Sequence, residues 1–148
     1  MAQVARHVAA PPERVFGILA DGWTYAGWVV GASHIRAVDP HWPAPDSRIH
    51  HAVGPWPLVI RDTTTVRELT TGHRLLLRVR IWPVGEGDVE FVVDPEPGGI
   101  GCTLTMTETI VTGPWQLLGP VTDPLLHARN VATLDRLAAL AEHREHAE

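Results

Sequence analysis

The order of periodic patterns along the chain constrains its fold more than any other feature. An alternating stretch at residues 3–8 precedes a short amphipathic pattern at residues 12–19, and a long helical pattern runs from about residue 120 to residue 142. Most of the sequence between residues 33 and 112 alternates with the two-residue period of a strand. These strands can bury their apolar faces together against the terminal helix. We therefore expect one curved antiparallel sheet wrapped around that helix.

Turn signals divide the central region into consecutive strands. The strands are expected at residues 33–38, 48–53, 58–69, 73–82, 88–94 and 101–112. A second short helix is expected at residues 23–30, where Tyr25, Trp28 and Val29 share one face. The expected class is α+β in a helix-grip arrangement, with two short helices after the first strand.

Composition limits the class of partner and the compartment. The formal net charge of −5 argues against nucleic acid, since phosphate binding relies on clustered lysine and arginine. No stretch reaches the ~20 apolar residues of a membrane span and no secretory signal is visible, so we expect a cytoplasmic protein without integral membrane association. The only cysteine, Cys102, forbids an internal disulfide. The 148 residues fit a single domain over residues 1–148, as a monomer or a homodimer.

The last strand and the last helix predict which side chains face inward. Cys102, Leu104, Met106, Glu108 and Ile110 alternate with four threonines, and threonine suits a solvated sheet face. The apolar set must then face the interior, with Glu108 as the polar exception. The helix carries two adjoining apolar stripes: Val121, Leu125, Ala128 and Ala132 in one, and Leu134, Leu137, Ala138 and Ala141 in the other.

The chain resembles the START-like, or SRPBCC, superfamily in its polyketide cyclase/dehydrase and lipid-transport branch. The likeness rests on Ala10–Phe16 after the first strand, Trp28 in the second helix, Thr107–Thr109 in the last strand, and Arg129-Asn130 with Leu134 and Leu137 in the final helix. It implies a deep apolar cavity between the sheet and the last helix. It does not imply one activity, because relatives include carriers, cyclases and sensors.

The cavity that the resemblance implies would be lined by the inner face of the sheet, the last helix and the second short helix. Tryptophan is a candidate lining residue because it combines a large apolar surface with one N–H donor. The candidates for ligand contact are Trp28, Trp56, Trp82, Met106, Glu108, Leu118 and Leu125.

The titratable residues on the strands have open interpretations. Glu108 is either a polar anchor or general acid/base inside the cavity, or a carboxylate that reaches solvent or pairs with an arginine. Asp62 has the same two interpretations. His34 and His50 are candidates for proton transfer, and because His50 and His51 are adjacent, one of the two must point inward. Each histidine is otherwise a strand-end residue with a backbone partner.

Other motifs indicate structure rather than chemistry. No His-Glu-x-x-His or Cys-x-x-Cys spacing is present, so we expect no metal and no cofactor. Arg129 is expected to reach a carboxylate of the sheet, and Asn130 to bond a carbonyl near the second short helix. Cys102 is expected to pack in the core.

The leading functional hypothesis is binding or carrying of a hydrophobic small molecule, such as a lipid, polyketide or aromatic metabolite. The first alternative is a cyclase or dehydratase that uses Glu108 with His34 or His50 as acid and base. The second is a regulatory protein–protein module. Binding without turnover leads, because the sequence shows no catalytic constellation.

Overall fold

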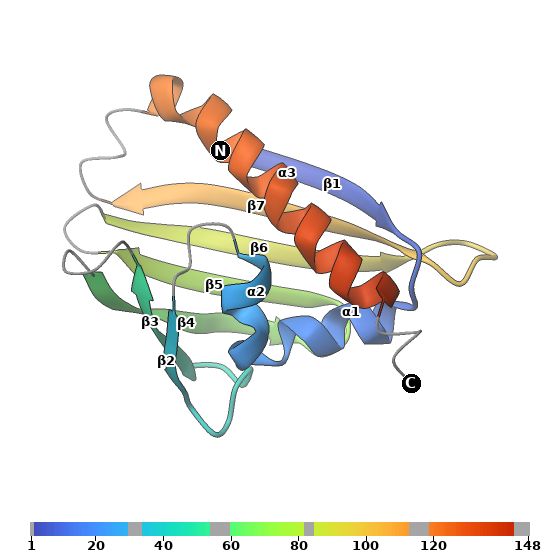
Figure 1. Cartoon of the computed structure of the whole chain (residues 1–148), viewed down its shortest axis with the longest axis horizontal. Helices are drawn as coiled ribbons and strands as arrows, with labels where there is room; N and C mark the ends of the chain where they lie inside the picture. The colour runs from blue at the N-terminus through green and yellow to red at the C-terminus, as the bar shows by residue number, and fades with distance from the viewer. Residues whose placement is uncertain (1, 30–33, 54–59, 82–84, 113–118, 144–148) are drawn as a thin grey trace.

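The computed structural model describes residues 2–29, 34–53, 60–81, 85–112 and 119–143 (Figure 1). In chain order the elements are β1 (Ala2–Val8), α1 (Pro12–Leu19), a 3₁₀ turn η1 (Gly22–Thr24), α2 (Tyr25–Trp28), β2 (His34–Val38), β3 (Arg48–Val53), β4 (Ile60–Thr70), β5 (Arg74–Ile81), β6 (Gly85–Pro95), β7 (Cys102–Thr112) and α3 (Gly119–His143). The expected second helix is thus a 3₁₀ turn followed by a single α-helical turn. β6 begins at Gly85, three residues before the strand expected at residues 88–94.

The strands form one antiparallel sheet in the order β1-β7-β6-β5-β4-β3-β2. Consecutive strands from β2 to β7 are neighbours, and β1 completes the sheet by pairing with β7, so that Val4 lies opposite Met106. On the other side of β7, Met106 lies opposite Phe91 of β6. This is the curved antiparallel sheet with a C-terminal helix that the sequence predicts, and the α+β helix-grip expectation is confirmed.

The two faces of the sheet differ as the alternation predicts. Buried apolar side chains from the central strands lie on the inner face: Val66, Leu75, Leu77, Val89, Phe91, Val93, Leu104 and Met106. The threonines of β7 lie on the outer face, where Thr103, Thr105 and Thr107 are half-buried and Thr109 is exposed. Threonine tolerates this face because it is β-branched and can still bond to water.

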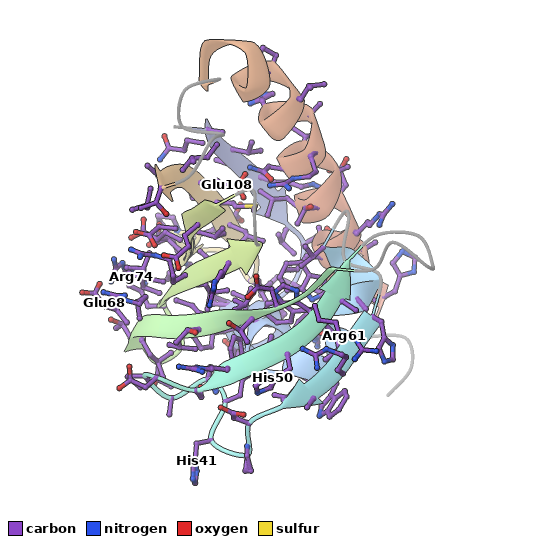
Figure 2. The ribbon with its side chains drawn as sticks, turned by 90° about the vertical axis from the view of Figure 1, so that its left-hand side faces the viewer. His41, His50, Arg61, Glu68, Arg74 and Glu108 are labelled. Carbon is purple, nitrogen blue, oxygen red and sulfur yellow. The ribbon has the colours of Figure 1, made fainter. Side chains whose placement is uncertain are left out.

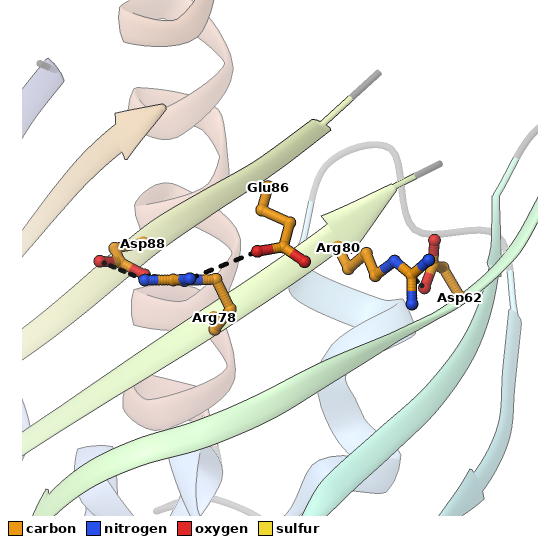
Figure 3. Close-up of polar contacts among 5 residues, drawn as sticks. All are labelled: Asp62, Arg78, Arg80, Glu86 and Asp88. Atoms are coloured by element: carbon orange, nitrogen blue, oxygen red, sulfur yellow. Dashed lines mark hydrogen bonds and ion pairs between the residues drawn. The ribbon is translucent and has the colours of Figure 1, made fainter. Parts of the chain in front are cut away.

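Ion pairs run across the outer face of β4, β5 and β6. Arg78 bonds to Asp88 and to Glu86 (Figure 3). Arg74 bonds in the same way to Glu68 and Glu90. Figure 2 shows Glu68 and Arg74 projecting from the side of the sheet opposite α3. Exposed pairs of this kind contribute about 0–1 kcal/mol each, so they help register the strands but do not hold the fold together.

All the helices lie on the inner side of the sheet (Figure 1). α3 buries Leu134, Leu137, Ala138 and Ala141, the second of its two apolar stripes. In the other stripe, Leu125 and Ala128 are exposed and Ala132 is half-buried. Two contacts fix α3 to β1 and the residue after it: Arg6 pairs with Asp135 at 3.3 Å, and the backbone N–H of Ala9 donates to Glu142 at 2.9 Å.

Cys102, the first residue of β7, is fully buried in the hydrophobic core. Burial, together with the negative charges of Glu96 and Glu13, raises the pKa of its thiol to about 11. The side chain therefore packs as a small apolar group, as the sequence predicts. Among the described helices, none combines the length and the apolar character needed to cross a membrane.

Candidate ligand-binding site

Glu108 is the polar side chain that the alternation of β7 places among apolar neighbours on the inner face. It shares that face with Leu104 and Met106, and it lies opposite Val89 of β6. Its side chain is 12% exposed, so most of the carboxylate is removed from water. Figure 2 shows Glu108 on the side of the sheet that α3 covers. A carboxylate in this position needs partners, because burying an unpaired charge is costly.

α3 supplies those partners. Nη2 of Arg129 donates to both carboxylate oxygens of Glu108, at 2.5 Å to Oε1 and 2.7 Å to Oε2. The expected contact from Arg129 to a carboxylate of the sheet is therefore present. The Arg129 side chain is 37% exposed, so this ion pair is open to solvent on one side. Hydrogen bonds between charged groups are roughly twice as strong as neutral ones, so the pair anchors α3 to β7.

Asn130 is fully buried beside this pair. Its Nδ2 donates weakly to Oε1 of Glu108 at 3.5 Å, and among the described residues this carboxylate, not the backbone carbonyl expected from the sequence, is its partner. The orientation of the amide follows from the chemistry, because only Nδ2 can donate to a carboxylate. Oδ1 of Asn130 has no hydrogen-bond partner among the described residues. A buried acceptor without a partner costs about 1–3 kcal/mol, so this atom is a position where a ligand donor would be stabilised.

Trp28 forms the aromatic part of the interior. It is 0% exposed, and its ring meets Phe91 of β6 edge-on, with centroids 5.7 Å apart and planes at 81°. On its other side it lies 4.4 Å from the ring of Tyr25. Its indole N–H donates to Oγ1 of Thr24 at 3.0 Å. Trp28 therefore offers an apolar surface to the interior but no free donor.

His51 is the histidine that faces inward. It shares a face of β3 with Ile49, which lies against Gly22 of η1, and it is 6% exposed. Its cross-strand neighbours are Ile35 of β2 and Asp62 of β4, and both are also buried. Burial lowers the pKa of His51, and the positive charges of Arg36 and His50 act in the same direction. The Thr63 carbonyl and the Asp62 carboxylate oppose this shift without reversing it.

The lowered pKa of His51 predicts a loss of stability in mild acid. Below the ordinary value of 6.5 the unfolded chain binds a proton at this residue that the folded protein does not, so the free energy of unfolding falls as the pH falls. The slope for one proton is at most about 1.4 kcal/mol per pH unit, and it ends at the folded-state pKa. Urea titrations from pH 7.5 to pH 5.5 should show this slope in the wild type and its loss in His51→Leu.

The matched control for this titration is His41→Gln. His41 is exposed in the loop between β2 and β3, where it projects into solvent (Figure 2). Its replacement should leave the acid slope of the wild type intact. If the stabilities of wild type and His51→Leu stay parallel from pH 7.5 to pH 5.5, His51 titrates alike in the folded and unfolded states. The ring would then not be desolvated.

The structure brings together some of the candidate residues and separates others. Trp28, Met106 and Glu108 lie on the inner side, and Met106 is buried between Val4 and Phe91. Leu125 is 70% exposed, so it does not contribute to the buried interior. The other three lie outside the described residues: Trp56, Trp82 and Leu118.

Neither His34 nor His50 lies near Glu108. His34 is exposed at the start of β2, and Nε2 of His50 contacts Oδ1 of Asp39 at 3.1 Å. Both are on the face of the sheet opposite His51, and β4, β5 and β6 separate β3 from β7. The expected pairing of Glu108 with either histidine is therefore wrong. Across the described ranges, no three His, Cys, Asp or Glu side chains converge to hold a metal ion.

Comparison with solved structures shows the same fold in distant proteins. An aromatase/cyclase from Streptomyces sp. R1128 superimposes with a TM-score of 0.73 at 19% identity, covering 97% of this chain and 93% of that chain. A protein of unknown function from Staphylococcus aureus gives a TM-score of 0.74 at 9% identity, covering 98% and 96%. Protein NE0264 from Nitrosomonas europaea gives 0.73 at 18% identity, covering 97% and 94%.

Sequence comparison assigns the family. No curated protein sequence matches the chain significantly. The family model described as polyketide cyclase / dehydrase and lipid transport matches residues 2–142, from the first residue of β1 to the end of the buried part of α3. Because this match covers nearly the whole chain, the protein belongs to the polyketide cyclase / dehydrase and lipid transport family.

Proposed function

We propose that this protein binds an apolar small molecule between the inner face of its sheet and the helices α2 and α3. The apolar walls would come from the buried side chains of β5, β6 and β7 and from Trp28. The polar end would be the group formed by Glu108, Arg129 and Asn130, here called the polar cluster. Ligand sites commonly combine a largely apolar lining with a few polar groups of this kind that fix orientation.

The unpaired Oδ1 of Asn130 is the observation that carries this proposal. A core that serves only stability avoids a fully buried acceptor without a partner. A hydroxyl or N–H group on a ligand would pair with Oδ1, while the rest of the ligand lay against the apolar side chains around Met106. The family to which the chain belongs includes lipid transport in its description, which agrees with a hydrophobic ligand.

The direct test is binding of an apolar probe to the natively folded protein. We expect 1-anilinonaphthalene-8-sulfonate to gain fluorescence at micromolar concentrations, and native mass spectrometry of freshly purified protein to show a co-purified small molecule. Near-UV circular dichroism would establish that the native fold, rather than a partly unfolded state, binds the probe. Absence of both signals in the folded protein would contradict the proposal.

A pair of phenylalanine substitutions locates the binding region. Val89 is 5% exposed on the inner face of β6, opposite Glu108. Val89→Phe should weaken probe binding, because the added ring would occupy the proposed site. Thr107→Phe adds the same ring on the outer face of the neighbouring strand β7, so it serves as the matched control. Equal probe affinity in folded Val89→Phe and Thr107→Phe would place the probe elsewhere.

A cyclase or dehydratase activity is the second candidate function, and the position of Glu108 favours it. Glu108 is a mostly buried carboxylate on the inner face, and such a group can accept a proton from a bound substrate. His34 and His50 take no part, because they lie on the opposite face. Glu108→Gln would separate the two functions. Loss of turnover of a poly-β-ketone substrate with unchanged probe affinity supports the enzyme, whereas no turnover by the wild type supports binding alone.

A further inference from the structure

We propose that His51 is a second polar position of the interior, distinct from the polar cluster, and that it recognises an uncharged hydroxyl group on the ligand. This inference rests on the proposed function, because it assumes that a small molecule enters the interior. It specifies what that molecule must carry: a hydroxyl group that forms one hydrogen bond with the ring, as donor or as acceptor.

The geometry around His51 supports this role. The residue is 6% exposed, and neither Nδ1 nor Nε2 has a hydrogen-bond partner within the part of the chain that the structure describes. The Thr63 carbonyl lies close enough to influence the ring, but it does not meet the geometry of a hydrogen bond with either nitrogen. A buried imidazole with both nitrogens unpaired is uncommon in a core that only supports the fold.

The neighbours of His51 leave the ring available while their own polar groups are engaged. Oδ1 of Asp62 accepts from the backbone N–H of Thr63 at 2.9 Å and lies 3.8 Å from Nε of Arg80 (Figure 3). The pairing of β4 with β5 ends at Thr64 and Val79, and Arg80 contacts Asp62 just beyond that end. Nε of Arg36 donates to the backbone carbonyl of His51 and not to its ring. The ring therefore faces an environment of buried apolar groups and one occupied carboxylate.

The chemistry of a neutral imidazole selects the kind of ligand group. One ring nitrogen carries a hydrogen and donates, and the other accepts. The two nitrogens point away from each other, so one ligand group can pair with only one of them. A hydroxyl group suits either nitrogen, because its O–H can donate and its oxygen can accept. A carboxylate on the ligand could pair only with the nitrogen that carries the hydrogen, and it would also face the negative charge of Asp62. A methyl group in place of the hydroxyl would leave that nitrogen without its hydrogen bond.

Two probes of nearly equal size test this inference. Equilibrium dialysis would measure the affinities of 2-naphthol and 2-methylnaphthalene for wild type, His51→Leu, His51→Gln and His50→Gln. We expect the wild type to prefer 2-naphthol by about tenfold, the ratio that one net hydrogen bond supplies. His51→Leu should reduce this preference to about one, mainly by weakening 2-naphthol binding. His51→Gln keeps one donor and one acceptor and should retain part of the preference.

His50→Gln is the matched control, because it changes the adjacent histidine on the opposite face of β3, where the ring contacts Asp39. It should keep the full preference for 2-naphthol. Two results would overturn the role of His51 while the proposed function stands. In the first, the wild type binds both probes with equal affinity. In the second, folded His51→Leu or folded His51→Gln binds 2-naphthol as tightly as the wild type and keeps the full preference for it. If the folded wild type binds neither probe, the proposed function fails and this inference fails with it. The wild-type preference and His51→Gln decide the question if His51→Leu does not fold.

Discussion

Replacing Trp28 with alanine is expected to lower the free energy of unfolding by about 3–5 kcal/mol, the range for removing a fully buried large aromatic side chain. Trp28 is 0% exposed and contacts Phe91 and Tyr25 through its ring. Its removal would also leave the Oγ1 of Thr24 without the indole donor, which adds to the cost. The loss amounts to a large part of the 5–15 kcal/mol by which domains are typically stable.

The measurement is urea unfolding followed by far-UV circular dichroism, which does not depend on the fluorescence of the deleted tryptophan. Trp23→Ala is the matched control, because Trp23 lies five residues away and is 60% exposed. Its replacement should change the free energy of unfolding by no more than about 0.5 kcal/mol. A cost below about 1 kcal/mol for Trp28→Ala would show that α2 does not pack on β6 as described.

Periodicity within single segments predicted the frame of this fold correctly. β7 alternates between buried apolar positions and threonines from Cys102 to Thr107, and its inner face could be assigned from sequence without any knowledge of its partners. The ends of α1 were equally clear, since Pro11 precedes it, Pro12 is its first residue and Asp21-Gly22 follow it. These features are local, so the sequence contains all the information they need.

The candidate site was less predictable, because it depends on which segments meet. Which stripe of α3 is buried is decided by its packing on β1 and α1, and two apolar stripes adjoin in its sequence. Leu125 therefore looked as suitable as Leu134, although only Leu134 is buried. Asn130 faces Glu108 for the same reason. The rotation of α3 about its axis places Asn130 next to Glu108 of the sheet, which lies 22 positions earlier in the sequence.

The inward histidine was, by contrast, available from the sequence. His51 is in register with Ile49 and Val53, whereas His50 is in register with the charged Arg48. An apolar set that alternates with a charged one predicts which histidine shares the buried face. The candidate list nevertheless contained His34 and His50, which the structure places on the outer face. The two-residue period of β3 therefore predicted the inward histidine better than the general suitability of histidine for proton transfer did.

Replacing Arg129 with methionine is expected to lower the free energy of unfolding by about 2 kcal/mol. Among its described neighbours, the carboxylate of Glu108, 12% exposed, would keep only the weak contact with Asn130 at 3.5 Å. Removing one partner of a fully buried ion pair costs about 3–5 kcal/mol. The cost here is smaller, because Arg129 is 37% exposed and water could reach the carboxylate after the substitution. Arg136→Met is the matched control, since Arg136 is an exposed arginine on the same helix, and it should change stability by less than about 0.5 kcal/mol.

A double-mutant cycle separates the interaction energy of Arg129 with Glu108 from the cost of leaving the Glu108 carboxylate unpaired. In Glu108→Gln the neutral amide replaces a mostly buried carboxylate, so the further change Arg129→Met should cost much less there than in the wild type. We expect a coupling energy of about 1–2 kcal/mol, measured by urea unfolding of the four proteins, because the two hydrogen bonds at 2.5 and 2.7 Å join charged groups in a partly dry site. A coupling energy near zero would mean that Arg129 interacts with Glu108 no more favourably than with water. The polar cluster would then not be fixed in advance for a ligand.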